Sequence, residues 1–171
     1  MSLLVIGGSG FLGGHVCRRA RAAGLTVATA GRGALPGSPA HSRVDLAQEE
    51  PGKIAAMIAS VAPDAVVNCA GVLQDNANDS TAAVHGSSPA ALYTACARAS
   101  IKRVVHISAI GVDRQAPTAF SRSKAQGDAA LMASGLDWVV LRPSVVVGRA
   151  AYGGSALFRG LAALPLLPRI A

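Results

Sequence analysis

A glycine-rich turn near the N-terminus constrains the fold of this chain more than any other feature. It follows an apolar run at residues 3–6 and leads into helical spacing, which predicts a buried strand, a tight turn and a helix start. Gly7 permits the sharp turn, Gly10 lets a ligand approach the backbone without an intervening Cβ, and Gly13 lets helix and strand pack closely. The helix start offers unpaired N–H groups and a positive dipole end to an anion. Glycine-rich turns also join strands to helices for purely structural reasons, so the turn alone does not establish a ligand site.

Strand-like and helix-like segments alternate along the whole chain. The strand-like apolar runs lie at residues 3–6, 25–30, 43–46, 65–70, 103–107 and 138–141. The helical patterns lie at residues 12–23, 54–61, roughly 81–99, 120–134 and 155–164. Pro89 marks a kink or a restart within the third of these helices. The alternation predicts an α/β fold with a doubly wound parallel sheet, in which ligands bind beyond the carboxyl ends of the strands.

Composition fits one folded domain, residues 1–171. Of the 171 residues, 51% are hydrophobic and 15% charged, which excludes a disordered chain. There is no apolar run of about 18 residues and no basic leader, so we expect neither a membrane span nor a secretion signal. Cys17, Cys69 and Cys96 are odd in number and widely separated, and they predict reduced, buried thiols in a cytoplasmic protein.

The net charge of +7 does not indicate nucleic-acid binding. Aromatic residues make up only 4% of the chain and the arginines are scattered. Four arginines and no acid follow Asp137, which a missing acidic continuation explains as well as a basic partner does. The four histidines show no metal-ligand spacing, so we expect no metal site. His106 fits a hydrogen-bonded core or interface position, and Ser87 and Ser88 resemble a helix cap.

Two residues after the second and third predicted strands suit the adenosine end of a dinucleotide. No acid that could bind a free 2′-hydroxyl occurs in residues 25–42. Arg32 stands there instead and suits a 2′-phosphate by charge and by forked hydrogen bonding, although a solvated loop arginine would look the same. Asp45 can accept from the adenine amino group or can cap the following turn.

Small and polar residues end the later strands. Residues 68–71 are small enough for a cofactor to lie against their backbone, or for close packing of a buried strand. Ser108 ends the fifth predicted strand. Lys124, near the start of the next helix, can reach ribose hydroxyls and can lower the pKa of a neighbouring phenol, although a lone lysine there is usually solvated.

Five motifs, in order and spacing, resemble the short-chain dehydrogenase/reductase superfamily. They lie at residues 7–13, 67–71, 105–108, 123–125 and 141–144, and so span nearly the whole chain. The resemblance is to the extended and atypical branches, the NAD-dependent epimerase/dehydratase group. It implies a Rossmann fold that binds NAD(P)(H), and a small-molecule substrate that the sequence does not identify. With Arg32 at the ribose edge, we expect NADP(H) to be preferred and NAD(H) to be possible.

The resemblance also implies which residues hold the cofactor. The implied set runs from the diphosphate through the adenosine end and the middle to the nicotinamide end: Gly7, Gly10, Phe11, Leu12, Arg32, Asp45, Leu46, Ala70, Gly71, Lys124, Pro143, Ser144 and Val145. Ser108 and Lys124 are the candidate catalytic residues.

The departures from the family pattern concern catalysis. The family's active tyrosine stands four residues before the lysine, where this chain has Phe120, which has no proton to give. Neither Tyr93 nor Tyr152 is positioned to replace it. After Ser108 the usual hydroxyls are missing, because Ala109 and Ile110 follow. The chain is similar in this respect to atypical members, including the Rossmann-type accessory subunit of respiratory complex I and its bacterial relatives.

The C-terminal segment is the second departure. Extended members carry a C-terminal substrate-binding region, of which residues 155–171 resemble only the start. This segment is apolar, and such a surface normally requires a cover. We expect a truncated chain, a second copy or another partner over this end, or an interfacial contact that makes the protein peripheral to the inner membrane.

Two hypotheses follow. The first is an NADP(H)-binding domain with weak or altered oxidoreductase or epimerase chemistry. The second is a non-catalytic, cofactor-bound structural or redox-sensing module.

Overall fold

The computed structural model describes residues 1–114, 118–148 and 154–163. Six parallel strands form one sheet with the order β3-β2-β1-β4-β5-β6. The strands are β1 (Ser2–Ile6), β2 (Thr26–Gly31), β3 (His41–Arg43), β4 (Ala65–Asn68), β5 (Arg103–Ile107) and β6 (Asp137–Leu141). This order defines the doubly wound dinucleotide-binding (Rossmann) arrangement and confirms the predicted fold class.

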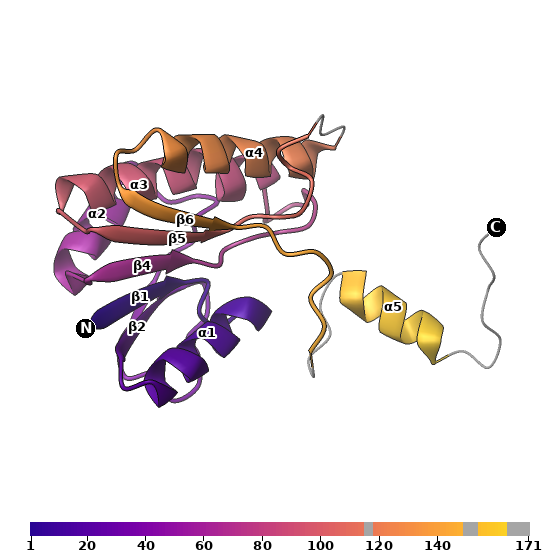
Figure 1. Cartoon of the computed structure of the whole chain (residues 1–171), viewed down its shortest axis with the longest axis horizontal. Coiled ribbons are helices and arrows are strands. Elements are labelled where there is room, and N and C mark those ends of the chain that lie inside the picture. The colour runs from indigo at the N-terminus through magenta and orange to yellow at the C-terminus, as the bar shows by residue number, and fades with distance from the viewer. Residues whose placement is uncertain (115–117, 149–153, 164–171) are drawn as a thin grey trace.

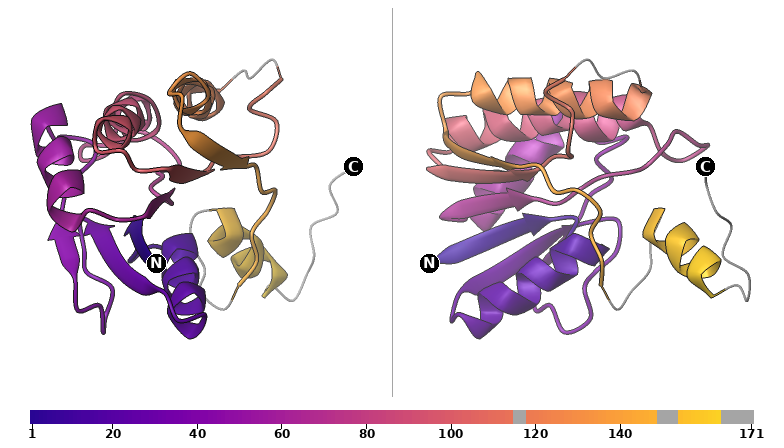
Figure 2. Two further views of the ribbon diagram at one scale, coloured as in Figure 1. Left: turned by 60° about the vertical axis from the view of Figure 1, so that its left-hand side comes forward. Right: turned by 45° about the vertical axis from the view of Figure 1, so that its right-hand side comes forward.

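Helices cover the two faces of the sheet (Figure 1). They are α1 (Phe11–Ala22), α2 (Pro51–Val61), α3 (Ser88–Arg98), α4 (Ala119–Met132) and α5 (Gly154–Ala162), with the π-helical turn η1 (Ala83–Ser87) leading directly into α3. Figure 2 shows α2, α3 and α4 on one face, α1 on the other, and α5 set apart from these layers. Pro89 is the second residue of α3, where the π-helical turn passes into the α-helix without a break, so it marks a change of helix type.

Each face of the sheet has its own apolar core. Leu4 and Ile6 of β1 point to the larger core beneath α2, α3 and α4, where Ile54, Ile58 and Leu92 are fully buried. Leu3 and Val5 alternate to the other face and pack with Cys17 and Ala20 of α1. The central strands β1 and β4 therefore have apolar residues on both sides, as the continuous apolar runs predicted.

Three local predictions were wrong. The third strand is His41–Arg43 and not residues 43–46, because Thr29 of β2 pairs with His41 and the apolar residues after the strand pack into the core. Cys69 is half-buried, whereas Cys17 and Cys96 are buried as predicted, and all three are free thiols. Ser87 makes no side-chain cap for α3, and the Ser88 hydroxyl donates to the Leu46 carbonyl instead.

None of the helices in the described part of the chain has the length and apolar character of a membrane span.

Candidate functional site

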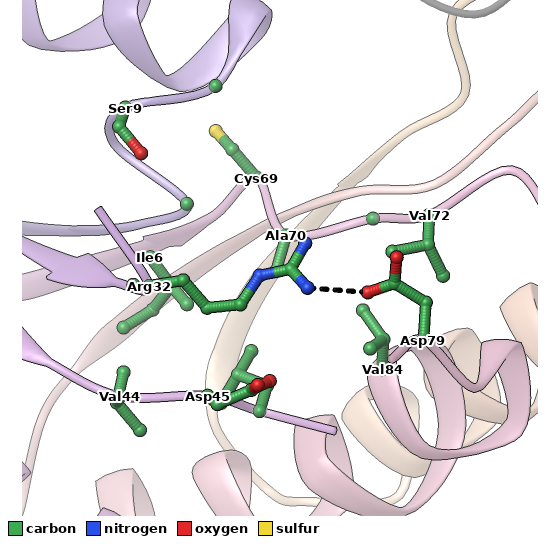
Figure 3. Close-up of a pocket in the computed structure, with 15 residues that line it drawn as sticks. Ile6, Ser9, Arg32, Val44, Asp45, Cys69, Ala70, Val72, Asp79 and Val84 are labelled. Atoms are coloured by element: carbon green, nitrogen blue, oxygen red, sulfur yellow. Dashed lines mark hydrogen bonds and ion pairs between the residues drawn. The ribbon is translucent and has the colours of Figure 1, made fainter. Parts of the chain in front are cut away.

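A pocket of about 180 Å³ lies at the carboxyl edge of the sheet, beside the point where the strand order reverses between β1 and β4 (Figure 3). Its walls come from the ends of β1 to β4 and from the segment that follows β4. The lining residues are Ile6, Gly7, Ser9, Gly10, Gly31, Arg32, Val44, Asp45, Leu46, Cys69, Ala70, Gly71, Val72, Asp79 and Val84. Open α/β sheets bind their ligands in this crevice.

The glycine turn forms the floor of the pocket. Gly7 has a φ of +72°, which favours glycine, and its N–H donates to the Ala30 carbonyl at 2.7 Å. The Gly10 N–H donates to the Gly7 carbonyl at 3.0 Å. A Cβ on Gly13 would overlap the Gly7 carbonyl oxygen. The turn therefore requires glycine at positions 7 and 13, and α1 packs directly against it.

The amino end of α1 borders the pocket and suits an anion. Gly10 is the N-cap without a side-chain hydrogen bond, and the first turn of α1 contains no acidic residue. The backbone N–H groups of a helix start and the positive end of its dipole suit a diphosphate, and the residues present fit that group. Phe11 and Leu12 lie in this first turn, but their side chains do not line the pocket; the Phe11 ring stands edge-to-face against His15 at 5.4 Å.

Arg32 reaches across the pocket from the end of β2 (Figure 3). Its Nη1 lies 2.7 Å from Oδ1 of Asp79, in the loop after β4. The Arg32 side chain is 54% exposed and that of Asp79 only 16%. Arg32 is thus at the predicted place but has an acidic partner that the sequence did not reveal.

Asp45 and Leu46 follow β3 and line the pocket beside Arg32. Asp45 Oδ1 accepts the Ala47 N–H at 3.0 Å, so Asp45 holds the local turn and borders the pocket at the same time. The two predicted roles of Asp45 are therefore compatible.

The segment after β4 forms the opposite wall. The Ala70 N–H donates to Oδ1 of Asn68 at 3.1 Å, which fixes the backbone where the strand ends. Cys69 faces the pocket, and burial raises the pKa of its thiol to about 12, so the thiol stays protonated. Gly71 has both Lys124 and His85 behind it, since a Cβ there would lie 3.5 Å from Lys124 Nζ and from His85 Nε2.

Lys124 lies behind this wall, and neither Lys124 nor Ser108 lines the pocket. Lys124 is 5% exposed and its Nζ donates to the Ile107 carbonyl at 2.9 Å, so the solvated alternative is wrong. Burial lowers the pKa of Lys124 to about 8, although the charge of Asp128 partly opposes this shift. Ser108 is 5% exposed and its hydroxyl has no hydrogen-bond partner within the described part of the chain.

His85 is a site residue that sequence analysis missed, because no local pattern marks it. Its Nε2 accepts the Val72 N–H at 3.0 Å, which places the ring proton on Nδ1, 3.1 Å from the Ser123 hydroxyl. The Phe120 ring stands edge-to-face over it at 5.3 Å. Burial, with the charge of Lys124, lowers the pKa of His85 to about 3, so the ring is neutral. At the position of the family's tyrosine, the structure thus has a phenyl ring over a neutral histidine.

The remaining predicted residues lie away from the pocket or outside the described ranges. Pro143, Ser144 and Val145 follow β6 without lining the pocket, and Val145 is 66% exposed. Tyr93 is buried on α3 with its hydroxyl 3.5 Å from Asn68 Nδ2, so it does not replace the missing tyrosine. Tyr152 lies outside the described residues.

His106 is buried in the core as predicted. Its Nδ1 lies 3.3 Å from Asn68 Nδ2, and its Nε2 lies 3.6 Å from Oδ1 of Asp128. Across residues 1–114, 118–148 and 154–163, no cluster of side chains could hold a metal ion.

A family model described as the NAD dependent epimerase/dehydratase family matches residues 3–159. The chain belongs to this family. No curated protein matches it. Among solved structures, the enzyme WbmH of Bordetella bronchiseptica in complex with NAD+ is similar in fold, with a TM-score of 0.78 at 22% identity, and the match covers 95% of this chain and 62% of that chain. For WbmG of the same organism, in complex with NAD, the TM-score is 0.76 and the identity 24%, and the match covers 95% of this chain and 60% of that chain.

The UDP-glucose 4-epimerase of Thermus thermophilus, in complex with NAD, is also similar in fold. Its TM-score is 0.70 at 25% identity, with 83% of this chain and 54% of that chain covered. The chain therefore spans less than two thirds of the length of these three structures.

Proposed function

We propose that the pocket binds a nicotinamide dinucleotide with its diphosphate against the glycine turn. One observation carries this proposal. Gly7 and Gly13 stand where a Cβ does not fit, and the turn that they form leads into a helix start without a side-chain cap, next to the point where the strand order reverses. The backbone of Gly10, Phe11 and Leu12 would hold the diphosphate. Membership of the family and the NAD complexes of the similar structures support this assignment.

At the adenosine end, Arg32 favours NADP(H) over NAD(H), because a guanidinium pairs with a 2′-phosphate through charge-assisted hydrogen bonds. Asp45 and Leu46 would border the adenine, with Ala70 and Gly71 along the middle of the cofactor. NADPH should therefore raise the melting temperature more than NADH does. Arg32→Ala should abolish this preference, and equal shifts in the unaltered protein would refute the role of Arg32.

The proposed chemistry is weak or altered oxidoreductase or epimerase activity on a small molecule. The bound nicotinamide would supply or accept a hydride. Ser108, whose buried hydroxyl has no described partner, would polarise a substrate carbonyl, and Lys124 would hold the ribose. Pro143, Ser144 and Val145 would approach the carboxamide. Since Phe120 donates no proton, a proton would come from water or from the substrate.

Substitution of the tyrosine favours a second candidate, a cofactor-bound structural or redox-sensing module. Here the dinucleotide would stabilise an interface with a second copy or a partner, and no reaction would follow. Residues 1–171 would form one domain in either case, with residues 155–171 as the start of a substrate-binding region. Cofactor binding without turnover on a panel of carbonyl compounds and sugar nucleotides would support the module.

A further inference from the structure

The ion pair between Arg32 and Asp79 lies where the proposed cofactor would present its 2′ group. Both residues line the pocket, one from the end of β2 and the other from the loop after β4. In Figure 3 the Arg32 guanidinium and the Asp79 carboxylate meet across the pocket, so a cofactor group that binds Arg32 there meets a guanidinium already paired with an acid.

The two partners are not held equally. Asp79 Oδ2 accepts from Asn76 Nδ2 at 3.0 Å, and the Asp79 N–H donates to Asn76 Oδ1 at 3.0 Å. The Asn76 N–H returns to the Asp79 carbonyl at 2.9 Å. Asp79 is thus fixed by its own turn with Oδ1 directed at Arg32. Arg32 is more than half exposed on a long side chain, so it is the partner that can swing away.

We propose that Asp79 sets the choice at the adenosine 2′ position by competing with the cofactor for Arg32. A 2′-phosphate must take the guanidinium from Asp79, whereas a 2′-hydroxyl can donate to Asp79 while the ion pair persists. Arg32 alone would give a strong preference for NADP(H), and Asp79 reduces this preference without removing it. This inference rests on the proposed dinucleotide site and adds a second specificity residue to it.

The test is a double-mutant cycle with NAD+ and NADP+, which differ only in the 2′-phosphate. Asp79→Asn keeps the shape of the side chain and removes its charge. Since exposed ion pairs contribute little, it should tighten NADP+ binding by about two- to fivefold while changing NAD+ binding less. Arg32→Ala should weaken NADP+ binding by about ten- to a hundredfold. In the Arg32→Ala background, Asp79→Asn should no longer affect NADP+.

Asp137→Asn is the matched control for charge, because Asp137 forms an exposed ion pair with Arg103 at the opposite ends of the strands. It should leave both affinities unchanged.

The proposal is overturned if Asp79→Asn leaves the ratio of the NADP+ and NAD+ affinities unchanged. It is equally overturned if the substitution tightens NADP+ to the same extent without Arg32, since Asp79 would then act only through its electric field. Absence of binding by both nucleotides to the unaltered protein would instead overturn the dinucleotide site itself. Isothermal titration calorimetry distinguishes these results.

Discussion

The two halves of the carboxyl edge differ in what they offer a ligand. At the ends of β1 to β4, a pocket is lined by backbone and by an exposed ion pair. Around β5 and α4, the polar residues Ser108, Lys124 and His85 are almost fully buried. Lys124 and His85 are hydrogen-bonded to the protein, and the Ser108 hydroxyl has no partner among the described residues. On the proposed function, the first half would bind the cofactor and the second would carry the chemistry, with Phe120 where the family has a tyrosine. Binding and catalysis should therefore respond to different substitutions.

Restoring the tyrosine tests the catalytic half most directly. Phe120 and Lys124 lie four residues apart on one face of α4, so the charge of Lys124 can lower the pKa of a phenol at position 120. A positioned general acid contributes about a hundred- to ten-thousandfold in rate. We expect Phe120→Tyr to raise NADPH-dependent turnover on a carbonyl panel by about a hundredfold or more.

Adding Lys124→Met to this variant should remove the gain, and Phe120→Leu should produce none. If Phe120→Tyr binds the cofactor and still shows no turnover, the catalytic half has lost more than one hydroxyl. The non-catalytic module would then be the better description.

The buried half should be more sensitive in stability. Asp128 is 3% exposed, and its Oδ2 accepts from Nε and Nη2 of Arg142 at 3.0 and 2.9 Å. Arg142→Met would leave this carboxylate without its bidentate partner, at a cost of about 3 kcal/mol in unfolding free energy. Urea unfolding at neutral pH measures the loss. The matched variant Arg103→Met breaks an exposed pair and should cost no more than about 1 kcal/mol. Equal losses would mean that burial does not distinguish the two pairs.

The glycine turn is where a small change should affect both binding and stability. Gly13→Ala places a Cβ against the Gly7 carbonyl oxygen, so α1 must shift away from the turn. We expect a loss of about 1–3 kcal/mol in stability, together with loss of nucleotide binding. In Gly52→Ala the new Cβ meets open space on α2, so that variant should be as stable as the unaltered protein or more so. Calorimetric binding and urea unfolding on both variants separate the two effects.

The sequence predicted the fold well where the pattern is local. Buried parallel strands such as residues 65–68 are apolar on both faces, and the glycine turn has a spacing of its own. The edge strand His41–Arg43 was misplaced because its residues are polar and its position depends on pairing with β2. Apolar residues just beyond it, Val44 and Leu46, carry the pattern but belong to the core.

The site was predictable only in part, for the same reason. Arg32 could be placed because it follows a recognisable strand. Asp79 lies 47 positions further along in a polar loop, and only the tertiary fold brings it to the guanidinium. His85 similarly meets Ser123 across 38 positions. Neither residue stands in a pattern that sequence alone can interpret.

Lys124 should make the stability of the protein depend on pH. Its folded pKa is about 8, against an ordinary value of 10.5, so between these values the unfolded chain binds a proton that the folded protein does not. Stability from this group therefore rises with pH through this window, by about 1.4 kcal/mol per pH unit, and the penalty is fully present below pH 8. Relative to Lys124→Met, the unaltered protein should thus gain stability between pH 8 and pH 9.

Subtracting the unfolding free energy of the variant from that of the unaltered protein removes the contributions of the cysteines and tyrosines, which also titrate there. Lys53→Met, at an exposed position on α2, should keep the unaltered profile. Parallel profiles for the unaltered protein and Lys124→Met would mean that the ammonium is solvated, and the two halves would then differ less than their geometry indicates.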